Sequence, residues 1–248
     1  WLTDQQRSGW ILKHGEISQL GFPNRYDTTI QSPEIVFKDL KISWKGEFLQ
    51  LMRLRYKKNH WIIIFPKKQK FVNKTTDYTI LTEDMRSSLI TEKPNIFRLI
   101  TQAKKLQVSS KHGNFILKDV QISLLLSNSE PNIFLQCSSI IHEKFELNQN
   151  MRFSAKISSQ KKITTTNILE TLTNTHLKLN EIKWQSGEKN LISKGNIELK
   201  FLESAKGFLY LEKDFKSTFD DLFNGSLSYS NFTRGIERLG INLNSSNF

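Results

Sequence analysis

The sequence has very few of the residues that build disulfides, metal sites and membrane spans. It contains one cysteine, Cys137, so no disulfide can form within the chain and no cysteine-based zinc site is possible. Its most apolar short run, Trp61–Phe65, is far shorter than the roughly 18 apolar residues of a membrane-spanning helix. Among its five histidines no two stand at metal-ligand spacing. We therefore expect no metal or other cofactor.

Catalytic motifs are also missing. The sequence has no Gly-x-Ser-x-Gly nucleophile turn, no phosphate-binding glycine loop and no dinucleotide fingerprint. The adjacent carboxylates Glu83-Asp84 and Asp220-Asp221 are typical of a surface turn and of the wet side of a helix, so neither pair supports acid–base catalysis. Cys137 stands in the apolar stretch IFLQCSSII, which predicts a buried, inert thiol. We expect a protein that is not an enzyme.

Acidic residues are scarce relative to basic ones, with 24 against 36, and the formal net charge is +12. Such an excess favours an anionic partner, whether nucleic acid, phospholipid head groups or an acidic glycan. In RLRYKKNHW, residues 53–61, the period places Arg53, Arg55 and Lys57 on one strand face and Tyr56 on the other, with Leu54 and Met52. We expect these cations on the solvated back of a sheet, and this separation from the aromatic face argues against nucleic-acid binding.

What the sequence does contain is alternation. Gly21-Phe22-Pro23 predicts a stiff corner, because glycine permits a positive φ and proline fixes its own φ. In the run that follows, Tyr26, Thr28 and Ile30 share one face, opposite Arg25, Asp27, Thr29 and Gln31. This period of two is typical of a strand with one drier side.

The same alternation recurs along most of the chain. It predicts strands around residues 10–20, 40–45, 49–57, 61–65, 78–80, 115–124, 145–147, 151–157, 177–184, 197–201 and 208–210. We expect a bulge near residues 51–52, where the phase shifts, and a hairpin around Asn148–Asn150. Helical spacing predicts short helices in residues 166–173, 215–223 and 232–239. The fold class is therefore mainly β, a largely antiparallel sheet of many strands with a few short helices near the C-terminus.

One domain, residues 1–248, accounts for the whole chain, and two β-rich halves, about 10–147 and 151–240, are an alternative division. Residues 39–51 and 179–192 both place a tryptophan at the end of an alternating strand, followed by a short turn with glycine and a second strand. This similarity is consistent with two related halves and equally with chance.

Several short motifs resemble a known family. They are the corner from Gly21 to Arg25, Trp44 before a short turn, Asn59–Pro66, and the later stretches IKWQSGEKNLISKGNIELKF, KGFLYLE and FKSTFDDLF. Together they resemble an uncharacterised proteobacterial envelope family, domain of unknown function two-one-two-five, although Asn24 replaces its usual aromatic residue. The strand pattern is also distantly similar to the AsmA-type proteins, whose curved sheets form apolar half-pipes implicated in lipid handling.

This resemblance implies a periplasmic body anchored to the inner membrane. The chain begins at Trp1 rather than methionine, so we expect the anchor in an upstream segment that is absent from this chain. The resemblance also implies a curved, half-pipe sheet, whose basic back would suit anionic head groups of a membrane surface.

We therefore expect lipid binding along an apolar sheet face, with lipid or the membrane surface as partner. The candidate ligand-binding residues are Tyr26, Ile30, Ile42, Trp44, Leu54, Tyr56, Trp61, Ile63, Trp184 and Phe201. The same face would instead be an ordinary core if the late helices covered it. Two other functions stay open: a structural module that binds an envelope protein through a sheet edge without any ligand, and an enzyme acting on envelope glycans or lipids, for which the sequence offers no catalytic group.

Overall fold

The computed structural model describes residues 10–38, 41–73, 76–93, 96–111, 113–127, 131–142, 145–148, 150–159, 177–186, 189–192, 196–200, 204–212, 227–233 and 236–244. Within these residues every regular element is a β-strand, and none is a helix. The strands are hydrogen-bonded into one large antiparallel sheet that does not close on itself. The prediction of a mainly β, antiparallel, many-stranded fold is confirmed.

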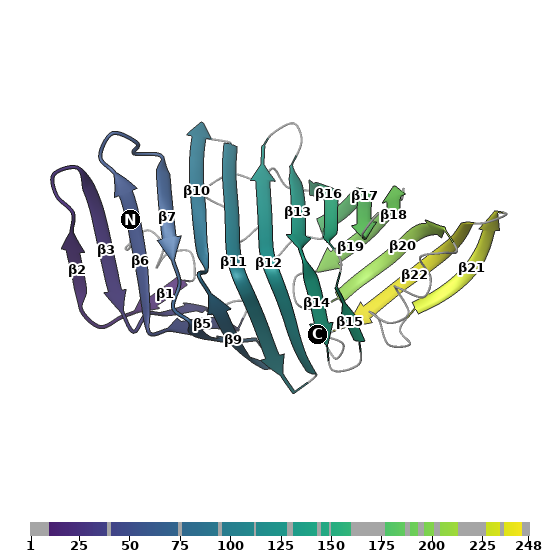
Figure 1. Cartoon of the computed structure of the whole chain (residues 1–248), viewed down its shortest axis with the longest axis horizontal. Helices are drawn as coiled ribbons and strands as arrows, with labels where there is room; N and C mark the ends of the chain where they lie inside the picture. Colours follow the sequence, from purple (N-terminus) through teal and green to yellow (C-terminus); the bar gives the residue numbers. More distant parts are fainter. Residues whose placement is uncertain are drawn as a thin grey trace.

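The sheet has two parts, an upper and a lower lobe, and each lobe has its own order of neighbouring strands. Strands β11 and β12 run through both lobes. The upper lobe of Figure 1 contains, in spatial order, β2 (Ile17–Leu20), β3 (Arg25–Gln31), β6 (Phe48–Leu54), β7 (His60–Ile64), β10 (Arg86–Lys93), β11 (Ile96–Ser110), β12 (Gly113–Leu126), β13 (Asn132–Cys137), β16 (Met151–Ser159) and β17 (Leu177–Ser186). The lower lobe contains β1 (Trp10–Lys13), β4 (Glu34–Phe37), β5 (Ile42–Gly46), β8 (Lys68–Val72), β9 (Asp77–Glu83), the same β11 and β12, β14 (Ser139–His142) and β15 (Phe145–Leu147).

The sheet continues beyond β17 towards the C-terminus. The two ends of β17 pair with different strands, and the last strands follow at the far end of the ribbon in Figure 1. These strands are β18 (Lys189–Ile192), β19 (Asn196–Lys200), β20 (Ser204–Glu212), β22 (Ile236–Asn244) and β21 (Leu227–Thr233).

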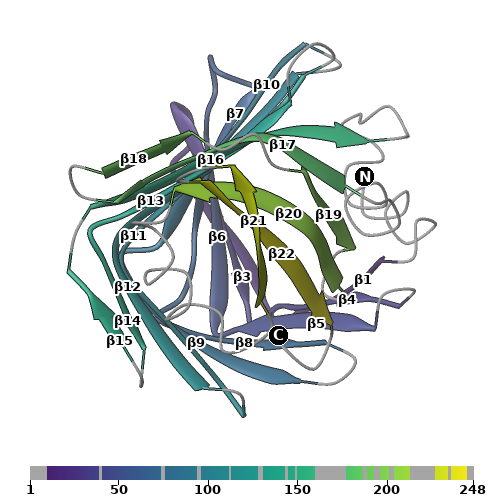
Figure 2. The ribbon, with the colours of Figure 1, turned by 90° about the vertical axis from the view of Figure 1, so that its right-hand side faces the viewer.

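The two lobes are joined because most strands of one lobe continue along the sequence into a strand of the other. Each such pair forms one long strand that bends between the lobes. β11 and β12 cross from lobe to lobe without interruption, and Figure 2 shows the ribbon bending there, with β7 and β10 on one side and β8 and β9 on the other. Neighbouring strands that are interrupted at the bend also stay hydrogen-bonded to one another there, through backbone groups. Examples are Gly15 N to Gln31 O at 2.8 Å, Ser32 N to Glu47 O at 2.8 Å and Thr82 N to Lys67 O at 2.8 Å.

The residues at the bend have unusual backbone conformations. Ser32, Asp84 and Asp119 have φ values of 45°, 53° and 50°, the left-handed region that non-glycine residues seldom adopt. Each stands between two stretches of regular pairing, and each shifts the in–out alternation by one residue. Thus Leu117 precedes the shift and Val120 follows it, yet both pack in one core cluster. The shift lets the apolar side of each strand face the same way on both sides of the bend.

The predicted corner at Gly21-Phe22-Pro23 is confirmed as the turn between β2 and β3. Gly21 has a φ of +85°, and Arg25 N donates to its carbonyl oxygen at 2.9 Å. A Cβ at this position would meet Arg25 Cγ at 2.8 Å, so only glycine fits without a shift.

Some local predictions were wrong. The helix expected at residues 232–239 is replaced by strands β21 and β22, because period-two pairing over nine register positions outweighs three residues at helical spacing. Residues 145–147 and 151–157 form no hairpin; β15 pairs with β14 and β16 with β13, as two parts of one bent strand. The phase shift expected near residues 51–52 lies at Glu47, between β5 and β6. The helices expected at 166–173 and 215–223 lie outside the described residues.

Candidate functional site

One side of the sheet, which we call the inner face, is apolar across both lobes. In the upper lobe, residues directly opposite one another on successive strands form two rows of mostly apolar side chains. The first row is Tyr26, Arg53, Trp61, Leu89, Leu99, Leu124, Ile133 and Ala155, and the second is Thr28, Leu51, Ile63, Ser87, Thr101, Ile122, Leu135 and Phe153.

Packing across the bend identifies this side as the inside of the curve. Val120, Cys137 and Met151 are buried and contact Ile122 and Leu135 of the upper lobe. They also contact three residues of the lower lobe, namely Leu106, Leu117 and Ile140. Away from this cluster most apolar side chains of the two rows are only half-buried, Trp61, Ile63, Leu99 and Ile133 among them. The inner face therefore keeps apolar surface that the described strands leave accessible.

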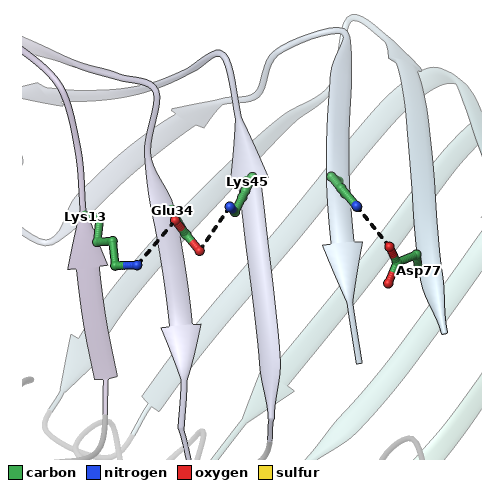
Figure 3. Close-up of polar contacts among 5 residues, drawn as sticks. Lys13, Glu34, Lys45 and Asp77 are labelled. Carbon is green, nitrogen blue, oxygen red and sulfur yellow. Dashed lines mark ion pairs between the residues drawn. The ribbon is translucent and has the colours of Figure 1, made fainter. Parts of the chain in front are cut away.

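The opposite, outer face carries most of the charge. In the lower lobe Lys13, Glu34, Lys45 and Lys70 stand opposite one another on β1, β4, β5 and β8. Glu34 lies 3.8 Å from Lys13 Nζ and 3.2 Å from Lys45 Nζ, and Lys70 Nζ lies 2.9 Å from Asp77 on β9 (Figure 3). At least one of the two side chains in each pair is solvent-exposed, so each ion pair adds little to the stability of the fold. They do define a polar surface that contrasts with the inner face.

The structure brings six of the ten predicted ligand-binding residues to the inner face. Tyr26, Trp61 and Ile63 lie in the two rows, Ile30 follows Tyr26 and Thr28 along β3, and Ile42 and Trp44 lie on β5 in the lower lobe. Trp184 lies on β17, opposite Phe153 in the backbone register. Phe201 lies outside the described residues.

Leu54 and Tyr56 are not part of the inner face, which corrects the sequence interpretation. Leu54 pairs with Arg25 on the outer face and is 37% exposed, and Tyr56 lies in the turn after β6 with 76% exposure. The phase along β6 is the reverse of the predicted one, because the bulge lies before this strand rather than within it. Asp27 was also expected on a wet face, but it is buried, with Arg25 Nε 2.7 Å from its carboxylate.

The same reversal puts Arg53, expected on the solvated back, on the inner face. Its guanidinium carbon lies 5.5 Å from the ring centre of Tyr26 and 4.7 Å from that of Trp61. Tyr26, Arg53 and Trp61 stand directly opposite one another on β3, β6 and β7, so the cation lies between two aromatic rings. Sequence reasoning missed this group, because Tyr26, Arg53 and Trp61 come together only through the pairing of β3, β6 and β7, which the local pattern does not show.

Trp44 is held by a buried polar network at the bend. Its indole Nε1 donates to Gln69 Oε1 at 2.9 Å, and Gln69 Nε2 donates to the Pro66 carbonyl at 3.2 Å. Thr82 Oγ1 donates to the same carbonyl at 3.2 Å. A Cβ at Gly46 would lie 2.8 Å from Pro66 Cγ, so glycine is needed for this close packing. Trp44 therefore has a structural role that fixes β5 and β8 at the bend.

The predicted burial of Cys137 is confirmed. The residue is 1% exposed on β13, and burial raises the pKa of its thiol from 9.0 to about 11. At neutral pH the protonated thiol is a poor nucleophile, so this position favours packing over chemistry.

The described residues contain no group of three or more His, Cys, Asp and Glu side chains that could hold a metal ion. Over the same residues, no helix has the length and apolar character needed to cross a membrane. The arrangement that stands out is thus an apolar inner face with one cation between two aromatic rings, and a charged outer face.

Comparison with known proteins identifies a family. Residues 1–133 match the model of a family described as an uncharacterized protein conserved in bacteria, DUF2125, and the matched part spans β1 to β12 with the bend and the Arg53 group. Neither the curated proteins nor the solved structures contain a match. Since the match covers more than half of the 248 residues, the chain belongs to the DUF2125 family.

Proposed function

We propose that this protein is a non-enzymatic lipid-binding protein of the bacterial envelope, in which acyl chains lie along the inner face of a half-pipe sheet. The observation that carries the proposal is the continuity of half-buried apolar side chains across successive strands of an open sheet. The resemblance of the strand pattern to AsmA-type proteins agrees with it. A catalytic constellation is not required for such a function, because apolar contact area supplies the affinity.

The dimensions suit an elongated apolar ligand. From β3 to β16 the two rows cross seven strand spacings, or about 34 Å at roughly 4.8 Å each. Burial of apolar surface contributes about 25 cal/mol per Å², so an acyl chain gains free energy for each methylene that it places against these rows. Ser87 and Thr101 interrupt the second row, but their hydroxyl oxygens lie 2.7 Å apart and form a hydrogen bond with each other. The two hydroxyls therefore satisfy each other, and an acyl chain can lie over them at a smaller desolvation cost.

The setting that we propose is the periplasm, with attachment to the inner membrane. The net charge of +12 and the lysines of the outer face favour contact with anionic head groups at a membrane surface. The polar outer face and the apolar inner face would then engage different parts of the same lipids or membrane.

The proposal is tested by two substitutions in neighbouring residues that face opposite ways. Ile63 is in the second row of the inner face, whereas Ile62 points to the outer face and is 38% exposed. Each protein would be purified from an envelope fraction without detergent, and its solvent extract would be examined by lipid mass spectrometry. We expect the wild type and Ile62→Asp to carry stoichiometric lipid and Ile63→Asp to lose most of it, because the charge would be buried against acyl chains.

A control protein of the same size and circular dichroism of all variants separate lipid loss from unfolding. Wild-type protein with no more lipid than the control would contradict the proposal. Equal lipid in folded Ile62→Asp and Ile63→Asp would contradict the assignment of the inner face.

A second candidate function is binding of an envelope protein at a sheet edge. In the described part of the chain β2 pairs with β3 alone, all four of its side chains are exposed, and Leu20 and the neighbouring Phe22 are 72% and 75% exposed. An open apolar edge can accept a strand from another protein. A photo-crosslinker at Leu20 that captures one partner, in protein free of lipid, would favour this function over lipid binding.

A further inference from the structure

We propose that Arg53 recognises the anionic head of an acyl amphiphile whose chain lies along the second row of the inner face. This inference rests on the proposed lipid-binding function and adds the class of ligand: single-chain amphiphiles with a carboxylate or a similar anion, in preference to neutral ones. Nothing in the family match assigns this role.

The placement of Arg53 is the first reason. It is the one basic residue in the two rows of the inner face, and its row neighbours on both sides are aromatic. The residues next along the strands are Thr28, Leu51 and Ile63, so apolar surface begins immediately beside the cation. An amphiphile with a charged head and an apolar tail has this same arrangement of chemistry.

The unmet hydrogen-bonding capacity of Arg53 is the second reason. Its Nε is buried and has no hydrogen-bond partner among the residues that the structure describes. The ion pairs of that part of the chain engage Arg25 and several lysines, and none engages Arg53. A buried, unpartnered N–H of a charged group is costly, whereas a carboxylate can accept two parallel N–H donors from one guanidinium.

The aromatic neighbours explain how this cation is kept on an apolar face without a carboxylate. Contact with the rings of Tyr26 and Trp61 stabilises the charge and orients the plane of the guanidinium. Because Nε is covered in the absence of a ligand, the head group would be seated by a rotation of the Arg53 side chain, a fast motion for a half-buried residue. The indole of Trp61 supplies no hydrogen-bond acceptor that would compete with an anion.

The test compares two ligands with the same acyl chain, one of which has an anionic head at pH 7.4 and the other a neutral one. Dodecanoic acid and methyl dodecanoate, below their aggregation concentrations at pH 7.4, would displace a neutral fluorescent probe from the purified protein. We expect the wild type to bind the acid about tenfold tighter than the ester, because a hydrogen bond to a charged group contributes about that much affinity. Arg53→Gln should bind both about equally, Arg53→Lys should keep part of the preference, and Arg55→Gln should behave as wild type, since Arg55 is exposed in the turn after β6.

The outcomes separate the two proposals. Displacement by neither ligand in the wild type would overturn lipid binding itself. Equal displacement by both in the wild type, or an undiminished preference in Arg53→Gln, would leave lipid binding standing and overturn the role of Arg53. Acetate serves as the anion without a chain, and displacement by acetate at the same concentrations would overturn the amphiphile in favour of a simple anion site. Retained ester binding shows that Arg53→Gln is folded.

Discussion

At the residue scale, several polar groups of the inner face are paired locally, whereas Arg53 Nε has no hydrogen-bond partner among the described residues. Trp44 and Gln69 bind each other at the bend, and Ser87 binds Thr101 on the neighbouring strand. Local pairing of this kind lets a polar side chain sit on an apolar surface without a large desolvation cost. The contrast with the buried, unpartnered Nε of Arg53 is what separates a structural polar group from a candidate binding group.

Cys137 gives a residue-scale prediction. Its thiol is buried and has a pKa raised to about 11, so at pH 8 only about one molecule in a thousand would carry the thiolate that reacts. We expect iodoacetamide to leave native protein unmodified over an hour at pH 8 and to label it completely in guanidinium chloride, as read by intact mass. Native labelling should become faster as the pH approaches 11. Labelling of native protein at the unfolded rate would contradict the buried position.

At the element scale, the bend explains which parts of the fold the sequence could predict. Alternation identified β3, β5 and β7 because their patterns stay in phase over several residues, and β12 because each of its halves, before and after Asp119, keeps its own phase. It failed for β11, the longest described strand, since apolar Ile100 stands at an outward position beside the inward Thr101 and the inward positions then pass from Ala103 to Leu106. The pairing of strands was likewise out of reach, because β15 and β16 look like a hairpin until their separate partners are known.

The candidate site was partly predictable for the same reason. Tyr26, Trp61 and Ile63 were found because each lies in a strand whose phase is regular. Arg53, Leu54 and Tyr56 were misplaced because one residue at Glu47 decides which way β6 faces, and nothing in the local pattern marks that position.

Asp119 gives an element-scale prediction about the bend. Its φ of 50° disfavours a β-branched residue, and its carboxylate accepts a hydrogen bond from Ser138 Oγ at 2.7 Å. We expect Asp119→Val to lower the free energy of unfolding by about 2 kcal/mol, from left-handed strain and the lost hydrogen bond together. Asp119→Gly keeps the backbone conformation and should lose less than about 1 kcal/mol. Urea unfolding measures both, and equal stability of the two variants would show that backbone strain is not what bends β12.

At the scale of the whole molecule, the described sheet is largely a meander of bent strands, and its stability should differ from the middle to the edges. β11 pairs with β9 and β10 on one side and with β12 on the other, so its backbone is bonded along most of its length in both lobes. In the described residues β1 pairs with β4 alone and β2 with β3 alone.

Hydrogen exchange followed by mass spectrometry tests this gradient. We expect peptides from β11 and β12 to exchange slowest and those from β1 and β2 to exchange within seconds to minutes, because edge strands open without disturbing the rest. Partner peptides β3 and β4 should lie between, as an internal comparison. Protection of β2 equal to that of β12 would mean that the edge is covered in solution.

The meander also has a consequence for how such a protein changes over generations. Since most bent strands pair with their neighbours in the sequence, duplication or loss of one bent hairpin would lengthen or shorten the sheet by two strand spacings, about 10 Å, and leave the remaining pairs intact. Each new strand would need its own one-residue phase shift at the bend, as Ser32, Asp84 and Asp119 provide here. Length is thus a property that such a chain can change in whole hairpins, whereas a single residue inserted away from the bend would reverse the two faces of the strand segment that carries it.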